Sequence, residues 1–150
     1  MTNDLVRLLQ EYVIEAERLG EMFAERHHMH PTDLHALLAV MQADQRGAPL
    51  TPGRLGRHLG LSSGATTAVI DRLERAGHVR RSRDDRDRRR VTLHHGTAEP
   101  DVGAAFFDAL DELMGTALTA YEPSELEAVR RFLVDTNELM RGHRRTVAAS

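Results

Sequence analysis

The chain of 150 residues contains no cysteine and no tryptophan, and only 4% of its residues are aromatic. Without cysteine it cannot form disulfides, thiolate metal sites or a cysteine nucleophile, and it cannot sense oxidants through a thiol. Few aromatic rings argue against a module that stacks RNA or single-stranded DNA bases on exposed rings. The sequence also lacks a glycine-rich phosphate loop, a nucleophile elbow and a matched acid–base pair, so we expect neither an enzyme nor a cofactor.

Long apolar runs are absent as well. No stretch approaches the roughly 18 apolar residues of a membrane-spanning helix, and acidic side chains are spread over the start of the chain. A hydrophobic content of 41% with 29% charged residues is typical of a folded domain. We therefore expect a single domain over residues 1–150 that is cytoplasmic and has no membrane partner.

The charge of the chain is distributed unevenly. The formal net charge is only −3, but residues 1–50 carry −4, residues 51–95 carry +6 and residues 96–150 carry −5. All 20 basic residues are arginine. A basic middle between acidic flanks predicts a surface that attracts the phosphates of a duplex, while the flanks stay away from them.

Apolar residues spaced three and four apart predict four amphipathic helices outside the basic middle. Their expected ranges are 3–28, 31–44, 102–120 and 124–140. The last helix is expected to open at Pro123 and Ser124, with Glu127 completing a capping box. The apolar stripe of the first helix is long for a small lobe to cover, so a partner subunit is expected to bury it.

Two shorter helices are predicted in the basic middle. Thr51 and Pro52 are typical of a helix start, and Gly60 is expected to end that helix. Ser62 or Ser63 is expected to cap the next one. Two short helices joined by a glycine-containing turn predict a helix-turn-helix.

A basic hairpin is predicted directly after these helices. Residues 78–83 and 89–93 can form short strands, and the intervening segment DDRDR is too charged for a core, so it is expected to be the exposed turn. A helix-turn-helix followed at once by such a hairpin predicts a winged helix.

The stretch LGLSSGATTAVIDRLERAGHVRRSRDDRDRRRVTL at residues 59–93 resembles the MarR family of bacterial regulators. Most specific is IDRLERAGHVRR running into DRDRRRVTL, with Asp87 and Arg89 in the Asp-x-Arg element of the wing. One departure is His94-His95-Gly96, where the family often has a threonine-rich segment. The resemblance therefore does not fix the residue at which the wing ends.

The resemblance implies a mainly α fold with a small β-wing. A winged helix-turn-helix lobe with a two- to three-stranded wing is expected over residues 31–97. Helical dimerisation regions are expected over residues 1–30 and 100–141, and a flexible tail over residues 142–150.

The resemblance also implies a function. We expect a homodimeric, sequence-specific transcriptional regulator, a repressor, that binds a pseudopalindromic operator in double-stranded DNA. Many relatives are released from DNA by small, often aromatic or phenolic molecules, and the resemblance makes such a molecule a candidate ligand here. The alternatives are a zinc-responsive regulator of the same fold and a winged-helix module that binds protein.

The expected DNA-binding residues lie on the second helix of the helix-turn-helix and on the wing. They are Ser62, Ser63, Gly64, Thr66, Thr67, Arg72, Arg83, Arg86, Asp87, Arg88 and Arg89. Arg89 is the favoured side chain for a narrow minor groove, with Asp87 orienting it, and Arg86 and Arg88 compete for that role. Arg72 could reach a phosphate or pair with a wing aspartate.

Nine histidines raise the question of a metal or an effector site. His27, His28 and His30 are weak metal candidates, because their spacing does not by itself define a tetrahedral site. His30 and His35 are candidates for binding an anionic or phenolic effector, on their expected position near the junction of the two lobes. Scattered polar histidines at helix ends are the favoured interpretation.

Overall fold

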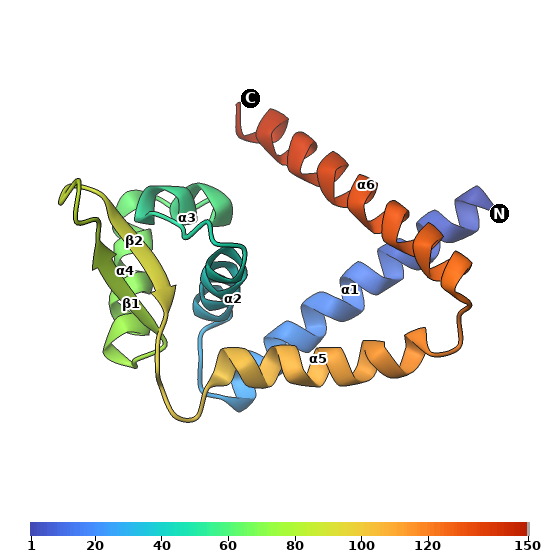
Figure 1. Ribbon diagram of the computed structural model, residues 1–150, viewed down its shortest axis with the longest axis horizontal. Coiled ribbons are helices and arrows are strands. Elements are labelled where there is room, and N and C mark those ends of the chain that lie inside the picture. Colours follow the sequence, from blue (N-terminus) through green and yellow to red (C-terminus); the bar gives the residue numbers. More distant parts are fainter. Residues whose placement is uncertain (150) are drawn as a thin grey trace. The chain divides into compact units, whose positions relative to one another are not determined.

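The computed structural model describes residues 1–149, and Ser150, the last residue of the predicted tail, lies outside the described residues. Within that range the chain is mainly helical with one small sheet (Figure 1). The elements are α1 (Thr2–Arg26), α2 (Pro31–Gln45), α3 (Pro52–Leu59), α4 (Ser63–Arg75), β1 (Val79–Arg83), β2 (Val91–His95), α5 (Val102–Leu118) and α6 (Pro123–Ala148). Two compact units divide the chain between Phe107 and Asp108, within α5.

The short helices start where the sequence predicts. The Thr51 hydroxyl accepts a hydrogen bond from the Arg54 amide at 3.3 Å, with Pro52 as the first residue of α3. Ser62, rather than Ser63, caps α4 by accepting from the Ala65 amide at 3.2 Å. Both caps satisfy amide groups that a helix start leaves without a partner.

The core of the first unit lies around α2, which is buried on most sides. Side chains from α2, α3, α4 and both strands meet there and are almost completely buried. The largest of them are Leu37, Leu55, Ile70, Leu93 and Val40, whereas Leu34 of α2 packs in a second cluster with Ala24 and Val102. Because apolar burial is the main favourable contribution to folding, this core holds the helix-turn-helix and the hairpin together in one lobe.

The crossing of α3 and α4 depends on a glycine. A Cβ atom added at Gly56 would lie 2.6 Å from the hydroxyl oxygen of Thr66, closer than real Cβ contacts come. The two helices therefore approach each other where no side chain separates them.

The wing is a two-stranded antiparallel sheet. Its register pairs Val79 with His95 and Arg83 with Val91, and Leu50 adds a single bridge to Leu93. The predicted range 89–93 for the second strand is wrong at both ends, because β2 runs from Val91 to His95. His94 and His95 therefore belong to the strand, which ends later than predicted but within the range 31–97 expected for the winged lobe.

The last helix is longer than predicted. It continues to Ala148 instead of ending at residue 140, so the flexible tail expected over residues 142–150 is helical as far as the structure describes it, up to a cap at Ala149. Its capping box also differs from the predicted one. Glu122 is the N-cap, and the side chain of Glu125, rather than that of Glu127, accepts from the Glu122 amide at 2.8 Å. No helix among the described residues is both long and apolar enough to cross a membrane.

Candidate nucleic-acid interface

Helix α4 presents one buried and one exposed face. Val69, Ile70 and Leu73 point into the core, whereas Ser63, Gly64, Thr67 and Ala68 are exposed. The exposed face carries small side chains, so the helix backbone can approach another surface closely. Of the small recognition-helix candidates, Ser62, Ser63, Gly64 and Thr67 are therefore accessible to a ligand.

Thr66 is the exception among the predicted contacts. Only 3% of its surface is exposed, and its hydroxyl donates to the carbonyl of Ser62 at 2.8 Å. Its side chain also lies against Gly56. The prediction that Thr66 contacts DNA is therefore wrong, and its role is to pack α4 against α3.

Arg72 forms an ion pair inside the lobe. Its Nε and Nη2 atoms donate to the two carboxylate oxygens of Asp33 at 2.8 and 2.7 Å. The hydrogen bond to Asp33 raises the pKa of Arg72. Because Asp33 lies in the first turn of α2, the pair joins α4 to the central helix. Of the two alternatives for Arg72, the structure therefore contradicts a pair with a wing aspartate, and contact with a phosphate stays a prediction.

Arg81 forms a second set of ion pairs within the lobe, between β1 and α4. It binds Asp71 at 2.6 Å and also the carboxylate of Glu74. The hydrogen bond to Asp71 is the main reason that the pKa of Arg81 is raised. Sequence patterns did not single out Arg81 among its neighbours, because its partners lie seven and ten residues earlier, beyond a turn.

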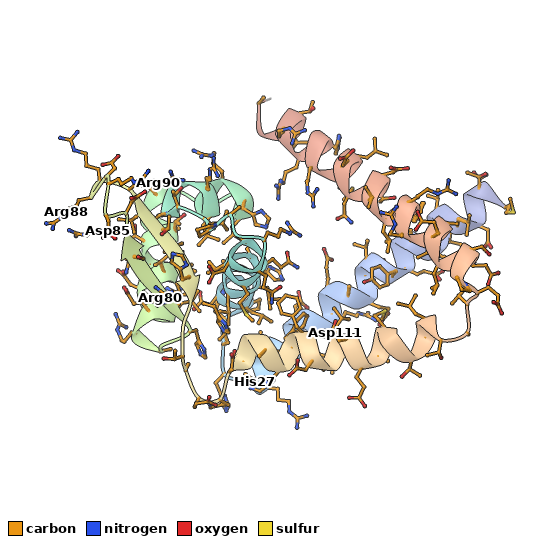
Figure 2. The ribbon with its side chains drawn as sticks, in the orientation of Figure 1. His27, Arg80, Asp85, Arg88, Arg90 and Asp111 are labelled. Carbon is orange, nitrogen blue, oxygen red and sulfur yellow. The ribbon has the colours of Figure 1, made fainter. Side chains whose placement is uncertain are left out.

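The hairpin tip is folded by its own aspartates. The Asp84 carboxylate accepts from the Arg86 amide at 2.9 Å, and the Asp87 carboxylate accepts from the Arg89 amide at 3.0 Å. Asp87 thus shapes the backbone at Arg89, the residue it was predicted to orient. The guanidinium groups are left exposed, and Figure 2 shows Arg88 at the tip pointing away from the helices.

The base of the wing is anchored by two histidines. His94 Nδ1 lies 2.8 Å from one oxygen of Asp44 on α2, and the His95 amide donates to the other oxygen at 3.1 Å. His95 Nε2 lies 3.1 Å from Asp101, which also accepts from the Ala104 amide at the start of α5. Two carboxylates therefore tie β2 to the helices on either side of the winged segment.

The pKa values of both carboxylates reflect these contacts. Burial by itself raises the pKa of Asp44, but the hydrogen bonds from His94 and from the His95 amide outweigh it and hold the pKa below its usual value. Burial opposes the shift at Asp101 too, where the Ala104 amide and His95 lower the pKa. Both groups therefore remain charged at neutral pH.

The histidine candidates do not form one site. His27, His28, His30 and His78 line a depression of about 690 Å³ beside the Asp33–Arg72 pair. The structure places His35 in a separate depression of about 380 Å³ between α2 and α3. His30 also caps α2, accepting from the Thr32 amide at 3.2 Å. Over residues 1–149, no three histidine, aspartate or glutamate side chains are grouped so that they could hold a metal ion.

Residues 27–90 match the sequence profile described as the MarR family. The chain is also 37% identical over 110 residues to an uncharacterised HTH-type transcriptional regulator, YcgE, of Bacillus subtilis strain 168. That alignment covers 73% of this chain and 69% of the relative.

Solved structures with the same fold cover nearly the whole chain. A MarR family protein from Bacillus stearothermophilus matches with a TM-score of 0.68 and 22% identity, covering 93% of this chain and 95% of its own. Streptococcus pneumoniae FabT in complex with DNA matches with a TM-score of 0.65 and 18% identity, covering 94% and 96%. These similarities show the winged-helix fold.

Proposed function

Because the chain belongs to the MarR family of transcriptional regulators and is not an enzyme, we propose that it represses transcription as a homodimer bound to a pseudopalindromic operator. Each winged lobe would place α4 in a major groove and the hairpin tip in the adjoining minor groove. The two half-sites would then lie about one helical turn apart.

The observation that carries this proposal is the pairing of two exposed features in one lobe. The first is the small-residue face of α4 around Ser63, Gly64 and Thr67, and the second is the cluster of exposed arginines at the hairpin tip. A close-approaching helix suits the major groove, and an arginine suits the focused negative potential of a narrow minor groove. FabT, a protein of the same fold, has been solved in complex with DNA, which supports DNA as the partner of this lobe.

Exposed apolar side chains on the long helices support the homodimer. On α1 they include Leu5, Leu8, Tyr12 and Ile14, each at least 46% exposed. Apolar surface of this kind, repeated along one helix, is typical of an interface between subunits. We assign a second copy of the chain to it because the family fold pairs two winged lobes on one duplex.

Arg89 offers the direct test of the wing. Binding of the purified protein to a duplex carrying its own promoter can be followed by fluorescence anisotropy at two salt concentrations. If Arg89 enters the minor groove, Arg89→Ala should weaken binding by about 1 to 3 kcal/mol. Arg26→Ala, an exposed arginine at the end of α1, is the control.

One result would contradict the proposal, and another would contradict only the role of Arg89. If the unmodified protein ignores double-stranded promoter DNA at low salt, the chain does not act through a duplex. Unchanged binding of the Arg89→Ala variant would remove Arg89 from the site and leave Arg86 or Arg88 as the inserted side chain.

The depression beside His30 favours a second element of the function, release from DNA by a small aromatic or phenolic acid. Its wall includes the Asp33–Arg72 pair, so an occupant would touch the contact that joins α4 to α2. A phenolic acid that binds the folded state should raise the melting temperature. His30→Asn removes the ring but keeps a side-chain acceptor for the α2 cap, and it should abolish that increase. Zinc serves as the comparison ligand in the same assay.

A further inference from the structure

The connection between β2 and α5 is fixed against the turn that precedes β1. The Gly96 amide donates to the His78 carbonyl at 2.8 Å, and the Ala98 amide donates to the Gly77 carbonyl at 3.0 Å. A Cβ atom added at Gly96 would overlap the carbonyl oxygen of Gly77, so only glycine allows this approach. Figure 1 shows the connection leaving the hairpin at the end opposite its tip. The segment that leads into α5 therefore lies against the base of the wing.

Three titratable side chains meet at this base. His95 Nε2 lies 3.1 Å from Asp101 Oδ1, and the same oxygen accepts from the Ala104 amide at 3.0 Å. Asp101 thus holds the end of β2 and the first turn of α5 together. The third side chain, His78, interacts electrostatically with both Asp101 and His95. One carboxylate therefore serves two imidazoles, and one of these belongs to the segment in which the sequence departs from the MarR pattern.

Charged groups from the neighbouring elements also face this cluster. Asp44 of α2 accepts from the His95 amide, but its other oxygen lies against the His94 ring, and Arg80 of β1 acts on the same carboxylate. On its other side, His78 lines a depression together with three histidines and an ion pair, namely His27, His28, His30 and Asp33–Arg72. The aspartates of α2 are therefore engaged with other groups, and Asp101 is the carboxylate that acts on His78.

The charge balance of the cluster depends on how many protons it holds. Because a carboxylate only accepts, a hydrogen on His95 Nε2 makes the contact with Asp101 whether the ring is neutral or charged. If His78 is charged as well, two cations share one carboxylate in a half-buried place and repel each other.

The pKa of His78 sets the pH range of this second proton. Burial lowers the pKa of His78 below 6.5, Asp101 opposes the shift and His95 adds to it. The neutral ring is therefore the form that the fold favours. Its contribution is fully present above the unfolded pKa near 6.5 and is lost as the pH falls through the folded pKa of His78.

A small movement at the base of the wing becomes a larger one at its tip. Each strand has five residues and is about 17 Å long, so a rotation of about 10° at the base displaces the tip by about 3 Å. That displacement is as long as a hydrogen bond and would take an arginine out of a narrow groove.

We propose that Asp101 is a positioning residue for DNA binding, which fixes the base of the wing through His95 until His78 takes up a proton. The inference rests on the proposed DNA-binding function. Asp101 acts on the duplex through the wing and not by contact. The wing is thus held for binding at neutral pH and released in acid.

The test is the pH profile of binding to a duplex that carries the protein's own promoter. Affinity is measured by fluorescence anisotropy at about pH 7.5 and about pH 5.5, one unit on either side of the ordinary imidazole pKa. Protonation of the other histidines adds positive charge to all variants alike, so each profile is compared with that of His78→Gln. The unmodified protein should lose affinity several-fold in acid relative to this variant, which cannot take up the second proton.

Further variants separate positioning from a merely structural role. Asp101→Ser keeps a hydroxyl that caps α5 but removes the charged partner of His95, so it should bind more weakly at the higher pH and lose little more in acid. His95→Gln keeps a side-chain N–H for Asp101 but cannot be protonated. It should bind normally at the higher pH and resist acid, and it decides the test if His78→Gln does not fold. His143→Gln removes an exposed histidine from α6 and should keep the unmodified profile.

Failure of this inference can be told apart from failure of the proposed function. If the unmodified protein binds the promoter duplex and Asp101→Ser binds equally well, Asp101 does not position the wing. If His78→Gln shows the unmodified pH profile, the contact does not depend on that proton. If the unmodified protein binds the duplex at neither pH, the DNA-binding function itself is overturned.

Discussion

The winged lobe and the second unit of the chain differ in what they bury. The lobe from α2 to β2 encloses several completely buried aliphatic side chains, among them Leu37, Leu55 and Leu93. From Asp108 to Ala149, no described side chain is fully buried, and Phe132 and Leu139 are 49% and 74% exposed. The lobe therefore closes its core within one chain, whereas the second unit leaves large apolar side chains exposed.

Removing a core side chain should have the largest effect on the lobe. Leu37→Ala leaves a cavity in the centre of α2 and should lower the free energy of unfolding by about 2 to 5 kcal/mol, measured by urea denaturation. Gln42→Ala, an exposed change on the same helix, should stay within about 0.5 kcal/mol of the unmodified protein. Equal effects would mean that α2 is not the centre of the core.

Adding a charge to the exposed apolar face should instead affect assembly. Phe132→Glu should weaken association of two copies by about 2 kcal/mol or more, measured by analytical ultracentrifugation, because a carboxylate would have to be buried in the interface. Arg131→Glu introduces the same group one residue earlier and should have a smaller effect. A monomeric unmodified protein would refute the dimer.

A double-mutant cycle on Arg72 and Asp33 tests the ion pair that joins α4 to α2. Loss of this pair should lower the free energy of unfolding by less than Leu37→Ala does. Arg72→Ala leaves a carboxylate that is only 9% exposed without its partner, so it should destabilise the protein more than the joint change Arg72→Ala/Asp33→Ala. Urea denaturation of the four proteins measures the coupling. Purely additive effects would mean that the pair contributes nothing beyond its separate side chains.

The smallest expected effect concerns pH and the base of the wing. Because the folded pKa of Asp44 is lowered, its contribution to stability is fully present above the unfolded pKa near 3.8 and is lost as the pH falls through the folded pKa. Asp44→Asn should therefore cost about 1 kcal/mol at pH 7, and this difference should vanish at strongly acidic pH. Urea denaturation at both pH values measures it, and a difference that persists in acid would contradict this assignment.

Local patterns predicted most elements but not every boundary. The caps at Thr51 and Ser62 depend on residues three positions apart, so they can be recognised without tertiary structure. The strand limits were wrong because His94 and His95 are held by Asp44 and Asp101, and Asp44 lies 50 residues earlier than His94. The candidate site shows the same difference between local and distant contacts. The exposed arginines of the hairpin could be predicted from the local charge pattern, whereas the burial of Thr66 depends on its packing against α3 and could not.

By itself, the sequence determined the order of the helices, the winged helix-turn-helix and the concentration of positive charge in its middle, because periodicity, capping and charge are local properties of the chain. Only the tertiary structure decided which charges are available to a ligand. Arg72 and Arg81 are similar to their neighbours in sequence, yet carboxylates from other elements hold them, while Arg54 and Arg57 remain exposed. An ion pair forms where the fold brings two groups within about 3 Å, and sequence spacing does not encode that distance.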